Sequence, residues 1–187
     1  RQISAFETAT RNLPGPRSLC NSAGLLGWPA AHGDWLRVGG LLYGLSVVAG
    51  KSGANLGFEP AMTLSTRLLA INELEPGDRV GYSATWTAPE AMRLGVAAIG
   101  YGDGYPRSAA SGTPVRVGSQ PARLAGRVSM DLVTLDLRQA PEARVGDRVV
   151  LWGPELPAET VAEHAGTIAY PLTCGMTRRV LFTEDDN

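Results

Sequence analysis

Three segments that combine glycine with a tyrosine, an arginine or a carboxylate constrain this chain more strongly than any other feature. They are Val80–Thr87, Ile99–Arg107 and Gly126–Asp131. Each one ends or follows a short apolar run that is typical of a strand, and glycine permits the tight turn that must come next. The pattern predicts short strands joined by turns that present polar, reactive side chains.

The second part of the chain is predicted to be a β-domain. Leu74–Val80 and Ala143–Val149 share a Gly-Asp-Arg-Val turn that leads into a strand. Pro114–Val117 and Val133–Leu137 alternate apolar and polar residues with period two. Many short strands separated by turns favour a barrel or a sandwich, and one helix, Pro157 to Ala165, is expected to interrupt them.

The first part follows a different pattern, with a helix predicted over Ile3 to Asn12. Arg17 to Cys20 is predicted to be a strand that leads into a short helix at Ala23–Gly27, and Trp35–Gly44 a second, mostly apolar strand. A strand, a helix and a second strand in this order indicate a parallel α/β sheet or barrel. The predicted division is an α/β part at 1–47, a Gly-, Ala- and Ser-rich linker at 48–60, and a β-domain at 61–187.

Composition excludes several classes of function. The 17 Lys and Arg residues nearly balance the 18 Asp and Glu residues, so no net field favours nucleic acid or an anionic membrane. No apolar run is long enough for a membrane helix. Cys20 and Cys174 lack disulfide or metal-ligand spacing, as do the two histidines. We therefore expect no metal site, and a reducing, cytoplasmic location.

Taken together, the motifs resemble the C-terminal portion of alanine racemase. Asn21-Ser22-Ala23 precedes Arg37-Val-Gly39-Gly40-Leu-Leu-Tyr43-Gly44 in the order and spacing of that family, and the three glycine segments follow. The resemblance extends from about Ile3 to Val180. It implies the last strands and helices of a (β/α)8 barrel, which binds pyridoxal 5'-phosphate (PLP), joined to a C-terminal β-barrel-like domain.

The resemblance implies that Ser22 and the backbone of Gly39 and Gly40 bind the PLP phosphate. It places Arg37 opposite the pyridine nitrogen, with Asn21 nearby. A guanidinium stays protonated and donates to that nitrogen, which makes the cofactor a weaker electron sink than one paired with a carboxylate. From the residues alone, the alternative is that Ser22 is a helix N-cap and that Gly39-Gly40 ends a strand.

Racemisation needs two bases on opposite faces of the cofactor. In the family one is the lysine that binds PLP, and the other is a tyrosine from the partner subunit's β-domain, which Tyr82 matches. Tyr101 matches a tyrosine that narrows the substrate corridor, and Arg127 a corridor arginine, as does Arg107. Met130 matches the residue whose N–H binds the substrate carboxylate, and Asp131 follows it. The alternative for Tyr82 is a strand residue with its ring in the core.

Two features depart from the family. Arg178 stands where many relatives have a tyrosine, and nothing matches the motif of the PLP lysine. Lys51, the only lysine, lies in the linker and is expected to be a solvated loop residue. We therefore expect this chain alone to be inactive and to need the N-terminal portion of the same enzyme.

The function implied is the interconversion of L-alanine and D-alanine, which provides D-alanine for peptidoglycan precursors, by a homodimer with composite active sites. Two alternatives stay open: a non-catalytic module that binds a partner or dimerises, and a racemase of broader amino-acid specificity. The motifs do not distinguish a biosynthetic from a catabolic role.

Overall fold

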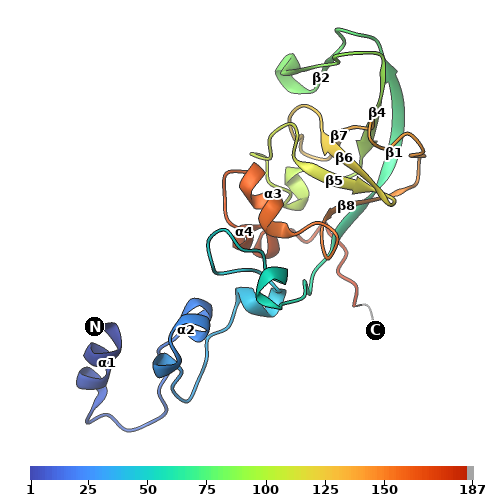
Figure 1. Cartoon of the computed structure of the whole chain (residues 1–187). Coiled ribbons are helices and arrows are strands. Elements are labelled where there is room, and N and C mark those ends of the chain that lie inside the picture. Colours follow the sequence, from blue (N-terminus) through green and yellow to red (C-terminus); the bar gives the residue numbers. More distant parts are fainter. Residues whose placement is uncertain (185–187) are drawn as a thin grey trace. The chain divides into compact units, whose positions relative to one another are not determined.

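The computed structural model describes residues 1–184 (Figure 1). It divides the chain into two compact units, Arg1–Ala61 and the residues from Met62 onward. No helix among residues 1–184 is long and apolar enough to cross a membrane.

Short helices joined by extended segments form the first unit. Its elements are α1 (Gln2–Thr10), α2 (Ser22–Gly27) and the 3₁₀ helices η1 (Pro29–Ala31), η2 (Gly40–Tyr43) and η3 (Ala54–Leu56). The helices predicted at Ile3–Asn12 and Ala23–Gly27 are confirmed. Gly44, just after η2, has φ +72°, and a Cβ there would lie 2.1 Å from the Glu59 carbonyl oxygen. Only glycine allows the chain to double back this closely.

The two strands predicted in this unit are wrong in extent. Within the described residues they meet in a single parallel bridge between Asn21 and Arg37, where the Arg37 N–H donates to the Cys20 carbonyl over 3.3 Å. The second half of the predicted Trp35–Gly44 strand is instead the helix η2. Glycines on either side of Leu41-Leu42-Tyr43 let the backbone coil, and no neighbouring strand among the described residues holds it extended.

In the second unit, six strands close into an antiparallel barrel in the order β1-β4-β7-β6-β5-β8. The strands are β1 (Leu64–Leu74), β4 (Met92–Ala97), β5 (Pro114–Val117), β6 (Gln120–Leu124), β7 (Val133–Asp136) and β8 (Arg148–Trp152). β1 closes the ring because it pairs with β8 through Leu64–Arg67 and with β4 through Leu68–Leu74. The period-two runs had left a barrel and a sandwich open, and the barrel-like domain that the resemblance implies is confirmed.

Alternating side chains fill the barrel. Val115, Leu135 and Val149 are among its fully buried residues. Gly95 on β4 faces inward, and a Cβ there would lie 2.8 Å from Leu68 Cδ1, so this glycine makes room for the leucine of the neighbouring strand. Tyr105 stacks on Trp152 with ring centroids 6.1 Å apart, and its burial raises the pKa of the Tyr105 hydroxyl.

The remaining elements extend from the barrel (Figure 1). A two-stranded ribbon, β2 (Arg79–Val80) and β3 (Trp86–Thr87), carries the 3₁₀ helix η4 (Tyr82–Ala84) between its strands. η5 (Tyr101–Asp103) follows β4. The expected helix after Pro157 is α3 (Ala158–His164), and α4 (Ala169–Cys174), which the sequence analysis missed, packs against it.

Candidate functional site

The predicted cofactor residues cluster in the first unit. The buried Ser22 Oγ accepts the Gly39 N–H over 3.2 Å, which brings the start of α2 against the segment before η2. Asn21 is joined to Arg37 by the parallel bridge. Four of the five predicted residues are therefore linked by these contacts, and Gly40 follows Gly39 directly as the buried first residue of η2.

The N-cap alternative for Ser22 is wrong. The cap of α2 is Asn21, whose Oδ1 accepts the Gly24 N–H over 2.9 Å. The Ser22 hydroxyl uses a lone pair for Gly39 and keeps its own hydrogen for another acceptor. A buried serine whose hydrogen has no acceptor among the described residues fits a bound anion.

Arg37 is held by the segment before Asn21. Its Nη1 donates to the Ser18 carbonyl over 2.9 Å and to Ser18 Oγ over 2.7 Å, and its Nη2 donates to the Leu19 carbonyl over 3.1 Å. The Nε hydrogen and one Nη2 hydrogen remain for a further acceptor.

The chemistry of this donor set fits PLP. Ser22, Arg37 and the Gly40 backbone contribute hydroxyl, guanidinium and amide donors, while the Gly39 N–H is bonded to Ser22 Oγ. None of the predicted residues is a carboxylate. Donors suit both a phosphate and an unprotonated ring nitrogen, which are acceptors. A pocket of about 600 Å³ borders Asn21 and Arg37, but Ser22, Gly39 and Gly40 do not line it. Lys51 is exposed, as expected for a loop lysine.

Tyr82 lies at the tip of the β2–β3 ribbon in the second unit. Its side chain is 71% exposed, so the core alternative is wrong. Ser83 and Ala84, which follow it, both have positive φ, at 62° and 49°. Such backbone costs about 1–3 kcal/mol for each residue that is not glycine, and strained residues of this kind cluster at functional sites. The strained turn presents the phenol outward.

The three glycine segments converge, which their separation in the sequence does not reveal. A Cβ on Gly81 would lie 3.4 Å from the backbone nitrogen of Arg127, so the Tyr82 segment packs against the segment of Met130. The Tyr101 N–H donates to the Ser129 carbonyl over 3.0 Å, and the Gly102 N–H donates to the Met130 carbonyl over 2.8 Å. The loops carrying Tyr82, Tyr101 and Met130 therefore form one surface, which we call the loop cluster.

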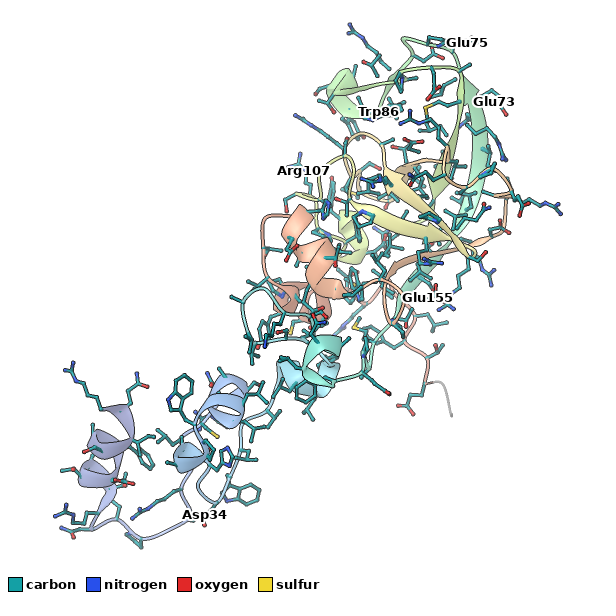
Figure 2. The ribbon with its side chains drawn as sticks, viewed as in Figure 1. Asp34, Glu73, Glu75, Trp86, Arg107 and Glu155 are labelled. Carbon is teal, nitrogen blue, oxygen red and sulfur yellow. The ribbon has the colours of Figure 1, made fainter. Side chains whose placement is uncertain are left out.

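Polar groups in the loop cluster are available to a ligand. The Met130 N–H has no hydrogen-bond acceptor among residues 1–184. The Arg107 guanidinium lies 5.7 Å from the centre of the Tyr101 ring, a cation–π arrangement. Arg127 and Asp131 are exposed. In the view of Figure 2, Arg107 lies on the left of the barrel and Glu73, on β1, lies on the right.

Sequence reasoning missed Arg179. Its Nε lies 3.1 Å from Asp103 Oδ1, and its Nη2 lies 2.6 Å from Asp131 Oδ1. A guanidinium thus joins the Tyr101 loop to the Met130 loop. No local signal in the sequence points to Arg179, because Asp103 and Asp131 each have an arginine four residues away, Arg107 and Arg127, in their own glycine segments.

Within the described residues, no group of three or more histidine, cysteine, aspartate or glutamate side chains could hold a metal ion. The fold and the site instead define a chain of two parts, a donor cluster suited to a phosphate-bearing cofactor and a closed barrel that displays an exposed tyrosine on a strained turn.

The chain belongs to the alanine racemase family. The family's C-terminal domain matches residues 61–183, and its N-terminal domain matches residues 1–47. The predicted resemblance to the C-terminal portion of an alanine racemase is confirmed.

Individual relatives agree. An alanine racemase of Nitrosococcus oceani is 59% identical over 180 residues, which are 96% of this chain and 50% of that protein. One of Shewanella amazonensis is 54% identical over 179 residues, or 96% of this chain and 49% of that protein. The chain thus spans about half the length of the curated relatives it matches.

Solved structures show the same fold. Biosynthetic alanine racemase from Pseudomonas aeruginosa superposes with a TM-score of 0.89 at 49% identity, covering 95% of this chain and 50% of that one. Alanine racemase from Acinetobacter baumannii gives 0.87 at 37% identity, with the same coverage.

Proposed function

We propose that the full-length protein containing this chain interconverts L-alanine and D-alanine with PLP, by a two-base mechanism. Family membership supports the reaction, and the exposed Tyr82 on its strained turn is the observation that carries the mechanism. We further propose that the protein works in the cytoplasm, because both cysteines are free thiols.

When bound, PLP withdraws electrons from the substrate and makes the hydrogen on Cα acidic. Ser22, Gly39 and Gly40 would hold its phosphate, and Arg37 would donate to its ring nitrogen from the position that Ser18 and Leu19 impose. Arg37 keeps that nitrogen unprotonated, because a guanidinium does not give up its proton.

The loop cluster would handle the substrate. The free Met130 N–H binds the substrate carboxylate, Tyr101 narrows the corridor, and Arg127 adds positive charge that attracts an amino acid's carboxylate. The Tyr82 phenol removes or returns the proton on one face of Cα. The base on the other face is a lysine in the family, and the motif that carries it has no match in this chain.

We propose that each active site combines Arg37 of one subunit with Tyr82 of the other in a two-fold dimer. Full-length Arg37→Ala and Tyr82→Phe proteins, mixed and allowed to exchange subunits, should then regain activity. Half of the dimers are mixed and each has one intact site of two, so about one quarter of the parent activity is expected.

The control mixture is Arg37→Ala with Ser22→Ala. In a mixed dimer, each of the two sites then has one substituted cofactor-binding residue. It should regain nothing. If the Arg37→Ala and Tyr82→Phe mixture stays as inactive as its parents after mass spectrometry has verified exchange, the composite site is excluded.

The 187-residue chain by itself is expected to show no racemisation. It lacks a match to the lysine motif, and Lys51 is an exposed loop residue. The chain is incubated with PLP and alanine, enantiomer content is followed by chiral chromatography, and borohydride is added to trap any lysine adduct. Racemase activity together with a stoichiometric adduct at Lys51 would overturn this expectation.

A further inference from the structure

Arg179 is the only described residue that bridges carboxylates of two loops of the loop cluster. Its Nε meets Asp103 Oδ1 at 3.1 Å and its Nη2 meets Asp131 Oδ1 at 2.6 Å. The other oxygen of Asp103 accepts the Gly100 N–H over 2.9 Å. Both carboxylate oxygens of Asp103 therefore have a partner. One binds Arg179, and the other binds the backbone at the start of the Tyr101 loop.

Thr177, two residues before Arg179, also binds the Tyr101 loop. The Thr177 N–H donates to the Asp103 carbonyl over 3.0 Å, and the Thr177 hydroxyl donates to the Gly102 carbonyl over 2.9 Å. These two bonds align residues 177–179 along the Tyr101 loop. They pre-orient the guanidinium, which lowers the conformational entropy lost when it bridges the carboxylates.

The guanidinium lies directly beside the residue with the free N–H. A Cβ on Gly102 would lie 2.4 Å from Arg179 Nη1 and 3.2 Å from Met130 Cγ. Gly102 thus allows the arginine and Met130 to pack over the same backbone. Asp131, which follows Met130 directly, is held at its side chain by Arg179 and is otherwise exposed.

This placement matters for an anionic ligand. Asp131 follows Met130 directly, and Arg179 links it to Asp103. The negative charges of the two aspartates would repel a carboxylate near the Met130 N–H. Arg179 offsets that repulsion and also restrains the Met130 loop, because its single planar guanidinium pairs with both aspartates. A lysine carries the charge but cannot bridge the two carboxylates in this geometry.

We propose that Arg179 is a positioning residue for substrate binding: it fixes the Met130 loop and neutralises Asp103 and Asp131, so that the Met130 N–H can donate to the carboxylate of the amino acid. The inference rests on the proposed function, because it assigns the substrate carboxylate to Met130.

The test compares Arg179→Gln and Arg179→Lys with Arg138→Gln in the full-length protein. Arg138 is a matched control, because it also bridges two carboxylates, Asp136 at 2.7 Å and Glu90 at 2.8 Å. It lies two residues after β7, outside the loop cluster.

Arg179→Gln should raise the KM for both alanine enantiomers about tenfold or more, with a smaller change in kcat, because a displaced N–H weakens carboxylate binding. Arg179→Lys should recover only part of the loss. Arg138→Gln should leave KM near the parent value even where its thermal stability falls as far. An unchanged KM in Arg179→Gln, or an equal rise in Arg138→Gln, overturns the proposal.

Amide hydrogen exchange separates this inference from the proposed function. The amides of Tyr101 and Gly102 are bonded to the Met130 loop, so they should exchange faster in Arg179→Gln and at the parent rate in Arg138→Gln. If the parent protein does not racemise alanine, the proposed function fails while this measurement still reports on the loop. Unchanged exchange in Arg179→Gln overturns the positioning role even in an active enzyme.

Discussion

Replacing Tyr82 by phenylalanine in the full-length protein is expected to slow racemisation by about 10²–10⁴-fold, the range for loss of a general base. The fold should survive, because the side chain is 71% exposed and the substitution removes only the hydroxyl. The loss should be unequal for the two enantiomers, since only one face of Cα loses its base. Exchange of the Cα hydrogen with deuterated water, followed by NMR for each enantiomer, measures this difference.

Tyr101→Phe provides the control for Tyr82→Phe. Tyr101 is a second exposed tyrosine in the loop cluster, and its ring, which contacts Arg107, is kept in the variant. We expect a change below about tenfold, because a residue that narrows a corridor does not transfer the proton. Small and equal losses for both enantiomers in Tyr82→Phe would exclude Tyr82 as a base.

A large effect on stability is expected for Gly104→Ala. Gly104 ends η5 with φ +104°, and a Cβ would lie 2.3 Å from the Gly175 carbonyl oxygen. The substitution combines an unfavourable backbone conformation, about 1–2 kcal/mol, with overpacking against backbone, about 1–3 kcal/mol. We expect the free energy of unfolding of the full-length protein to fall by about 3 kcal/mol, measured by urea denaturation.

Gly112→Ala separates the cost of the backbone conformation from the cost of overpacking. Gly112 has a similar φ of +91°, but a Cβ there would have no atom within 4 Å. It should lose only the backbone part, about 1–2 kcal/mol. Equal losses in the two variants would show that the contact between Gly104 and Gly175 relaxes without cost, and that the Tyr101 loop is not held tightly against the segment after α4.

The local patterns of the β-domain predicted some of its strands, because alternation reflects burial on one face, but they missed β1 and β6. Val133–Leu137 and Pro114–Val117 became β7 and β5. The same reasoning failed at Trp35–Gly44, where an apolar run without neighbouring strands among the described residues coils into η2. An apolar run reports burial, and burial alone does not distinguish a strand from a helix.

The candidate site was predicted in part. Asn21, Ser22 and Arg37 were recognised as a set through the family motif, and the structure brings them together around the bridge between Asn21 and Arg37. Arg179 was not recognised, because its partners lie 76 and 48 positions earlier in the chain (179 − 103 and 179 − 131). Spacing along a sequence carries no information about ion pairs of that separation.

The sequence by itself determined the chain's family, the β character of its second part, and the glycine turns that carry Tyr82, Tyr101 and Met130. These depend on residue identity, local periodicity and the conformational freedom of glycine. Only the tertiary structure decided that β1 closes the barrel between β8 and β4, that the three loops form one surface, and that Arg179 holds two of them together. Closure and ion pairing depend on contacts between distant segments, whose geometry exists only once the barrel has folded.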